Sequence, residues 1–290
     1  MTIKFAEDLV NMCIQKGCNL YGAAIEYEIS RTGKSKEEIM AIMRKNLRIM
    51  KDSVNKGLNE DVKGKIIGGE AKKIKERSKM SKSVCGQTMT KAISYSLAAA
   101  EVNASMGKIV AAPTAGSCGV IPGVLFTLEE EFGLSEGELV NGLFAASAIG
   151  IVIAKNATLS GAEGGCQAEI GSAAAMGAGM AVEMLGGTPK QAFDAGAIAL
   201  KNLLGLVCDP IAGLVESPCV KRNAMGVAKA LICAEMALAG VESVVPFDEV
   251  VLSMQNIGKV MPCTLKETAE GGVAATPTGK KIRDKIFGST

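Results

Sequence analysis

The chain has 290 residues, enough for one large core, and its 32 basic and 30 acidic side chains leave a net charge of +2. This balance argues against a nucleic-acid partner, and an aromatic content of 3% without tryptophan leaves few rings on which bases could stack. The sequence contains nine cysteines and no histidine. Any acid–base or metal chemistry must therefore use other side chains.

The apolar residues make up 48% of the chain and are mainly Ala, Val, Ile, Leu and Met, accompanied by 34 glycines. This composition is typical of closely packed helices. The first residues, 1–8, lack the charged start and apolar run of a signal peptide, so we expect a cytoplasmic protein. Cysteines in a reducing compartment seldom form disulfides, and most are expected to be small buried side chains.

Residues 1–85 are charge-rich and amphipathic, and they predict an N-terminal helical segment. Within it, Ser35-Lys-Glu-Glu38 is a capping box that opens a helix through Met50. The lysine-rich stretch 63–82 is more typical of a solvated helix or linker than of a basic contact surface.

From residue 86 the composition changes to Ala, Gly and Ser, and we expect a second, larger domain over 86–290. A helix is predicted from Gly86 to Met106, and Gly107 ends it. Residues 108–112 are short and apolar, which favours an extended segment. A loop at 113–119 leads into a helix at 121–132.

Ser135-Glu-Gly-Glu138 is a second capping box, and its helix is predicted to run to Ala154. The apolar run 139–154 is shorter than the ~20 residues that cross a bilayer. We therefore expect a buried central helix and no membrane partner.

A loop at 155–166 precedes a predicted Ala/Gly/Met helix at 167–185. Thr188-Pro-Lys-Gln191 combines an N-cap, a first-turn proline and a capping partner, and its helix is predicted to reach about Val207. Ser217-Pro218 opens a further helix at 219–239. Because no segment alternates strictly between apolar and polar residues, the sequence predicts a mainly α fold, with a large helical core of Gly/Ala-rich central helices.

Three of the cysteines, Cys166, Cys208 and Cys219, fall at predicted helix boundaries, 42 and 11 residues apart. Cys166 begins one helix, Cys219 lies in the first turn of another, and Cys208 is predicted to end the helix between them. Helix N-termini favour thiolates. The two prolines and one glycine between Cys208 and Cys219 favour a turn that brings these sulfurs together.

Three thiolates without histidine suit an iron–sulfur cluster. A cubane cluster needs four ligands, so three from the protein leave one iron open as a Lewis acid. Structural zinc is the competing metal, but it favours Cys-x-x-Cys pairs, which the chain lacks. Cys118 is an alternative ligand or reactive thiol, and Cys233, on an apolar helix, is expected to pack.

Five segments together resemble the α subunit of the iron–sulfur-dependent L-serine dehydratases of the two-chain type. The segments are Ala112-Pro-Thr-Ala-Gly-Ser-Cys-Gly-Val-Ile-Pro122, Ser160-Gly-Ala-Glu-Gly-Gly-Cys-Gln-Ala-Glu-Ile-Gly171, Gly205-Leu-Val-Cys-Asp-Pro-Ile-Ala-Gly213, Pro218-Cys-Val-Lys-Arg-Asn-Ala224 and Lys266-Glu-Thr-Ala-Glu-Gly-Gly272. Ala115 departs from the pattern, because family members often carry asparagine there.

The resemblance implies that Cys166, Cys208 and Cys219 hold a [4Fe-4S] cluster and that a β subunit is the partner. It implies conversion of L-serine, a small amino-acid substrate, to pyruvate and ammonia. Single-chain relatives can end in a cysteine that returns to the cluster, whereas this sequence ends in Phe287-Gly-Ser-Thr290. The fourth position is then expected to hold water or substrate.

Alternatives to this activity are a related lyase acting on L-threonine or L-cysteine and a non-enzymatic iron–sulfur or structural zinc protein. A pyridoxal-phosphate dehydratase is a weaker alternative, because the chain has no convincing phosphate loop; its best match is Lys65-Ile-Ile-Gly-Gly69.

Because the chain has no histidine, the base that removes the α-proton must be a Lys, Glu, Asp, Cys or activated Ser of this chain, of which Lys155 is the preferred candidate, or come from the partner. The resemblance implies that the β chain supplies a histidine. A lysine at the end of an apolar helix also suits a solvated role. Ser160 is the second catalytic candidate. Candidate substrate contacts are Thr114, Gly116 and Ser117 in the glycine-rich loop, whose amides could hold a carboxylate, together with Asn156 and Asn223.

Overall fold

The computed structural model describes residues 3–80 and 82–288, and within these ranges the fold is mainly α-helical and contains no β-strand. The predicted fold class is confirmed. The helices are α1 (Ala6–Lys16), α2 (Leu20–Thr32), α3 (Lys36–Asn59), α4 (Glu70–Ser78), α5 (Gly86–Ala104), α6 (Val120–Phe132), α7 (Glu136–Asn156), α8 (Gly161–Gly164), α9 (Ser172–Met184), α10 (Pro189–Lys201), α11 (Cys219–Leu238), α12 (Phe247–Val260) and α13 (Pro277–Phe287).

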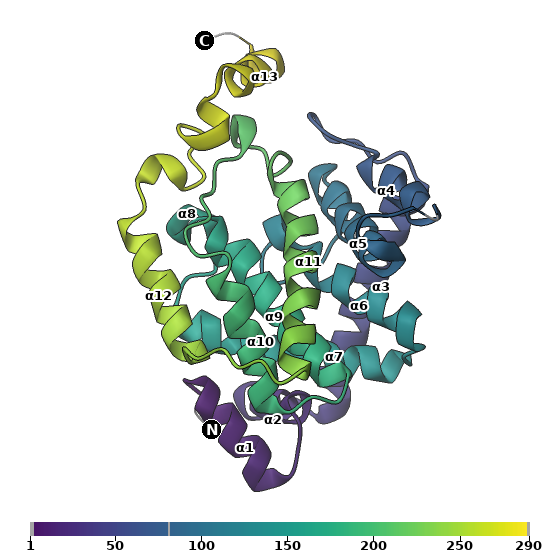
Figure 1. Cartoon of the computed structure of the whole chain (residues 1–290), viewed down its shortest axis with the longest axis vertical. Helices are drawn as coiled ribbons and strands as arrows, with labels where there is room; N and C mark the ends of the chain where they lie inside the picture. Colours follow the sequence, from purple (N-terminus) through teal and green to yellow (C-terminus); the bar gives the residue numbers. More distant parts are fainter. Residues whose placement is uncertain (1–2, 81, 289–290) are drawn as a thin grey trace.

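Helix α9 lies at the centre and packs against α6, α7, α10 and α11. Helix α12 covers one flank of this group, and α3, α4 and α5 form the other flank (Figure 1). The N-terminal helices α1 and α2 lie at one end of the molecule, and α13 lies at the opposite end. Helix α11 begins toward the α13 end and runs back toward α1 and α2.

The predicted helix starts are confirmed at the capping boxes. Ser35 and Glu38, Ser135 and Glu138, and Thr188 and Gln191 each exchange side-chain and backbone hydrogen bonds at the starts of α3, α7 and α10. These contacts are local in sequence, which is why the sequence could predict them.

Three boundaries differ from the predictions. Helix α10 ends at Lys201, not near Val207, because the chain turns at 202–205 before the proline is reached. Residues 108–112 form no strand, since no neighbouring strand is present among the described residues. The loop 155–166 contains the short helix α8.

Small side chains allow α9 to occupy the centre. Its sequence, SAAAMGAGMAVEM, is buried from Ser172 to Val182. A Cβ atom at Gly179 would lie 2.9 Å from Ile149 of α7 and 3.0 Å from the Ala192 carbonyl oxygen of α10. Helices on both sides therefore approach more closely than any larger residue would permit.

Helix α7 is long and apolar enough to cross a membrane by length and composition, but 67% of its most apolar window is buried inside the protein. Twelve of its residues, from Leu139 to Ile153, are buried against the core. The predicted buried central helix is confirmed.

Carboxylates from distant helices cap the N-termini of three helices in the N-terminal segment. Asp248 accepts from the Ala6 amide, Glu183 accepts from Leu20 and Tyr21, and Glu101 accepts from Glu70 and Ala71. The local N-caps of α1, α2 and α4 make no side-chain cap hydrogen bond. These carboxylates satisfy amides that a helix start leaves free and suit the positive end of the helix.

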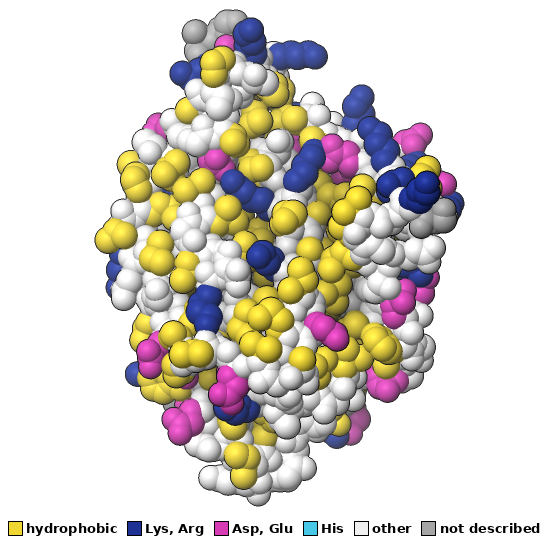
Figure 2. All heavy atoms as spheres, in the orientation of Figure 1, with side chains coloured by type: hydrophobic (Ala, Val, Ile, Leu, Met, Phe, Trp, Pro, Cys, Tyr) yellow, Lys and Arg dark blue, Asp and Glu magenta, His cyan; other side chains and the backbone are white. Residues whose placement is uncertain are grey.

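Apolar residues from both sides of residue 85 contribute to the same core cluster. The division at residue 85 stays a prediction. On the face shown in Figure 2, basic and acidic side chains are scattered among apolar ones, in keeping with the balanced charge.

The contact between α3 and α5 generates the first prediction. A Cβ atom at Gly57 would lie 2.4 Å from the Ala98 carbonyl oxygen and 2.6 Å from its Cα. Gly57→Ala should therefore lower the free energy of unfolding by about 2 kcal/mol, because the helix backbones must separate.

The matched control is Gly137→Ala in α7, where the nearest atom is Ser135 Oγ at 3.9 Å. That variant should be neutral or more stable by about 0.5 kcal/mol, since alanine favours helices. Urea unfolding followed by circular dichroism measures both values. Equal stability of the two variants would contradict the packing argument.

Candidate functional site

The three cysteines are buried and are presented by three different local structures. Cys166 precedes a π-helical turn at Gln167–Gly171, a distortion that is frequent at functional sites. Cys219 is the first residue of α11. The prediction that Cys208 ends a helix is wrong: it lies seven residues beyond α10 in an extended segment that bridges to Lys266.

The three thiols are neighbours of one another. Burial raises the pKa of Cys166 to about 12. The positive charge of Arg222 opposes this rise, and the negative charge of Glu169 adds to it. Burial and then the negative charge of Cys166 raise the pKa of Cys219 to about 12. Burial also raises the pKa of Cys208, and Cys166, two glutamates and Cys219 add to the effect. The structure thus brings together the three cysteines that the sequence singled out.

Glu169 lies beside these thiols. Its Oε2 accepts from Cys208 Sγ at 3.9 Å, and its Oε1 accepts from Thr114 Oγ1 at 2.7 Å. Thr114 Oγ1 also lies 3.1 Å from Ser117 Oγ. Burial raises the pKa of Glu169 above its usual value. The hydrogen bond from Thr114 opposes this rise, and the negative charge of Glu267 adds to it. The Glu169 carboxyl group therefore contacts both the predicted substrate loop, through Thr114, and Cys208.

Asn223 joins the glycine-rich loop to Cys219. Its Oδ1 accepts from the Gly119 amide at 2.8 Å, and its Nδ2 donates to the carbonyls of Gly116 at 2.7 Å and Cys219 at 3.0 Å. The side chain is buried. Asn223 therefore holds the loop in place through all of these bonds, and its amide has little capacity left for a substrate.

Gln167 holds the turn that carries Cys166 in place, as Asn223 holds the glycine-rich loop. Its backbone amide donates to the Leu206 carbonyl at 2.9 Å, and its side chain accepts from the Gly205 amide at 2.9 Å. The side-chain amide also donates to Gly164 and Met254. The turn that carries Cys166 is thereby fixed to the segment that leads to Cys208.

A buried ion pair joins Cys208 and Cys219 to the C-terminal segment. Arg222 donates to Asp209 Oδ1 at 2.8 Å and to the Val207 carbonyl at 2.9 Å. Asp209 Oδ2 accepts from the Val273 amide at 2.7 Å.

The backbone of the C-terminal segment also pairs with Cys208. The Cys208 amide donates to Leu265, and the Glu267 amide donates to the Cys208 carbonyl at 2.6 Å. Glu267 has a left-handed φ of 64°, which is uncommon for a residue with a side chain. Residues 263–275 consequently form one wall of the site.

The donor set fits an iron–sulfur centre by its chemistry, because three thiols and a nearby guanidinium suit a cluster of thiolate ligands. Among residues 3–80 and 82–288, no three Cys, Asp or Glu side chains are drawn together tightly enough to hold a single metal ion. A cluster binds each thiolate to a different iron, so its ligands need not be as close. The residues that could hold it are Cys166, Cys208 and Cys219.

Three of the predicted site residues lie elsewhere or make other contacts. Lys155 is exposed, and its Nζ lies 5.5 Å from the centre of the Tyr27 ring. Asn156 donates to the Lys4 and Val152 carbonyls. Ser160 is the N-cap of α8, directly before Gly161, which packs against Glu169 and Cys208.

Cys118 faces away from this group, toward the Ala99 carbonyl of α5 at 3.8 Å. Burial raises its pKa to about 12. Cys233 is buried in the main core.

The sequence analysis did not single out Glu169 or Asp209, whereas Arg222 is a candidate contact because it flanks Cys219. A signal was present: Glu169 and Arg222 each follow a cysteine by three positions, so they share its helical face, and Asp209 is adjacent to Cys208. Charged residues at these spacings from the candidate ligands could have been added to the predicted site.

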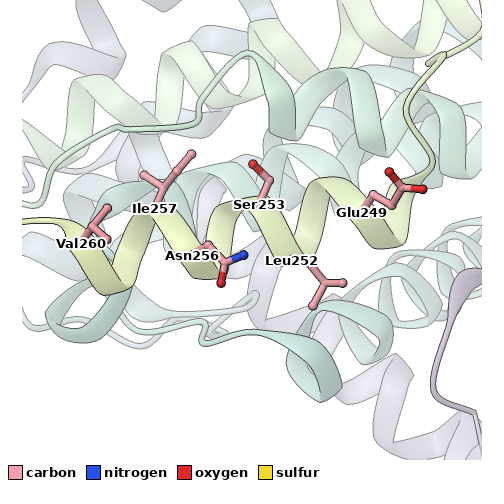
Figure 3. A pocket seen from close by; sticks show the side chains of 6 residues that line it. All are labelled: Glu249, Leu252, Ser253, Asn256, Ile257 and Val260. Carbon is pink, nitrogen blue, oxygen red and sulfur yellow. The ribbon is translucent and has the colours of Figure 1, made fainter.

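A separate surface groove runs along α12 and is lined by Glu249, Leu252, Ser253, Asn256, Ile257 and Val260. Figure 3 shows these side chains along the helix. Its lining contains no cysteine and no predicted site residue. The groove is therefore not part of the candidate site.

Residues 15–274 match the family model described as "Serine dehydratase alpha chain". The chain belongs to this family. A "Probable L-serine dehydratase, alpha chain" of Bacillus subtilis is 49% identical over 284 residues, which cover 97% of this chain and 94% of the relative. An "L-serine dehydratase, alpha chain" of Peptoniphilus asaccharolyticus is 47% identical over 280 residues, 96% of each chain.

A relative from Streptomyces coelicolor, named "L-serine dehydratase", is 36% identical over 276 residues. The match covers 92% of this chain but only 60% of that relative. A sequence similar to this chain thus also occurs within a longer chain.

The Asp209–Arg222 pair generates the second prediction. Asp209→Asn leaves the partly buried Arg222 without its counter-charge, so the free energy of unfolding should fall by about 3 kcal/mol. Urea unfolding measures the loss, and hydrogen exchange should quicken in residues 263–275. The control, Asp284→Asn, removes an exposed pair with Arg283 and should change stability by less than about 0.5 kcal/mol. A similar loss in both variants would count against the role of the buried pair.

Thiol reactivity in the metal-free chain gives the third prediction. A thiol with a pKa of about 12 is ionised in about one molecule in 10,000 at pH 8, so Cys166 and Cys219 should resist iodoacetamide. Their labelling should rise about tenfold per pH unit, because the thiolate reacts. Peptide mass mapping should find the exposed Cys85 and Cys263 labelled first. Rapid labelling of Cys166 at pH 8 would be inconsistent with this burial.

Proposed function

We propose that this chain, together with a β chain, converts L-serine to pyruvate and ammonia with a [4Fe-4S] cluster held by Cys166, Cys208 and Cys219. The observation that carries the proposal is the meeting of three buried thiols from three segments, in a chain of the serine dehydratase alpha-chain family. The names of its relatives support serine as the substrate and an alpha chain as one part of an assembly.

The bound cluster would supply a Lewis acid at its open iron, which makes the β-hydroxyl of serine a better leaving group. The chain's own residues arrange the site around it. Arg222 lies beside Cys166 and Cys219 and offsets thiolate charge. Asn223 holds the loop of Thr114, Gly116 and Ser117 beside Glu169. The Thr114 and Ser117 amides bond within the loop, so the Gly116 amide is the one proposed to meet the substrate carboxylate.

The reaction removes the α-proton and the β-hydroxyl as water. The resulting aminoacrylate tautomerises to an imine, and a second water releases pyruvate and ammonia. The chain has no histidine, and Lys155 faces Tyr27 without a contact to the thiols. We therefore propose that the partner β chain provides the base, with Lys155 as the alternative within this chain.

Anaerobic reconstitution with iron and sulfide, followed by addition of the β chain, tests the proposal. Cys166→Ala, Cys208→Ala and Cys219→Ala should each lose iron and acid-labile sulfide and lower pyruvate formation by more than about 100-fold, since each removes a cluster ligand. Cys233→Ala, in the same helix as Cys219 but in the main core, is the control and should retain its iron.

Pyruvate from serine, 2-oxobutyrate from threonine and sulfide from cysteine are measured in parallel to assign the substrate. Zinc without acid-labile sulfide, or a cluster without turnover in the presence of β, would overturn the proposed function.

A further inference from the structure

We propose that Glu169 binds the α-ammonium group of the amino-acid substrate. The inference rests on the proposed function, because it takes the space beside the three thiols as the substrate site. It assigns a substrate contact to a residue of the π-helical turn that follows Cys166.

The Glu169 carboxylate lies between two glycines, Gly161 at the start of α8 and Gly116 in the predicted substrate loop. A Cβ atom at Gly161 would lie 2.5 Å from Glu169 Oε2 and 3.0 Å from Cys208 Sγ. A Cβ atom at Gly116 would lie 2.9 Å from Glu169 Oε1. Both glycines therefore lie close to the carboxylate, which is positioned between the predicted substrate loop and Cys208.

The acceptor capacity of Glu169 is largely unused, in contrast to other inward-facing carboxylates. Glu101, Glu183 and Glu216 each accept from two or more backbone amides. Among the residues that the structure describes, Glu169 accepts only from the Thr114 hydroxyl and, at 3.9 Å, from the Cys208 thiol. A carboxylate has about four lone-pair sites, so at least two remain for a ligand.

The negative charge around Glu169 favours binding of a cation. Within the described ranges, no lysine or arginine nitrogen lies within salt-bridge distance of it, and Arg222 is committed to Asp209 and Val207. Glu267, from the C-terminal wall, adds a second negative charge that faces Glu169 and Cys208. The α-ammonium of an amino acid supplies a positive charge and three donors on the atom next to the carbon that loses its proton.

The experiment compares Glu169→Gln with wild type after anaerobic reconstitution with the β chain. The KM for L-serine and the inhibition constant of L-glycerate, which carries a hydroxyl in place of the α-ammonium, are measured for each. Loss of a charged hydrogen bond should raise the KM for L-serine about 10- to 100-fold and leave glycerate inhibition within about threefold. Glu169→Asp, which retains the charge, should recover part of the loss. Glu235→Gln, an exposed change on α11, is the matched control.

Iron and acid-labile sulfide contents provide a readout that does not depend on turnover, and they should be unchanged in Glu169→Gln. An unchanged preference for L-serine over L-glycerate would overturn the inference. A parallel loss of both ligands, or a loss of iron, would also overturn it and would assign Glu169 to loop positioning or to the metal centre. Wild-type protein that forms no pyruvate would instead overturn the proposed function, and that result is obtained before any variant is compared.

Discussion

Buried polar side chains that join the cysteine-bearing segments are the constraint on which the site depends. Asn223 joins the glycine-rich loop to Cys219, Gln167 joins the Cys166 turn to the approach to Cys208, and the Asp209–Arg222 pair joins Cys208 to the C-terminal wall. Each group would cost about 1–3 kcal/mol if left buried without its partner. Because every partner lies on a different segment, the three thiols are held together only when the whole core has formed.

The same principle attaches the charge-rich N-terminal segment. The N-cap side chains of α1, α2 and α4 make no cap hydrogen bond, and carboxylates of Asp248, Glu183 and Glu101 accept from amides in their first turns. The Glu216 carboxylate likewise accepts from the backbone amides of residues 65–67, which precede α4. Inward-facing carboxylates in this protein thus usually organise backbone, and Glu169, which faces the thiols, differs from them in this respect.

The arrangement explains how a chain without histidine can contribute to a dehydratase. In the proposed function its contribution is a set of three soft sulfur donors, a glycine-rich loop and the Glu169 carboxylate, all near the start of α11. Groups that move protons are scarce in this set, which agrees with a division of labour between an alpha chain and a partner.

The sequence alone determined the features that depend on near neighbours in the chain. Capping boxes set the starts of α3, α7 and α10, composition set the helical class, and three cysteines in recognisable motifs indicated the site. Tertiary structure decided which candidates meet. It placed Cys208 on an extended segment paired with Lys266, turned Lys155 toward Tyr27, and added Glu169 to the thiols. These outcomes depend on hydrogen bonds and packing between residues up to 128 positions apart (Tyr27 and Lys155), and no local pattern encodes such partners.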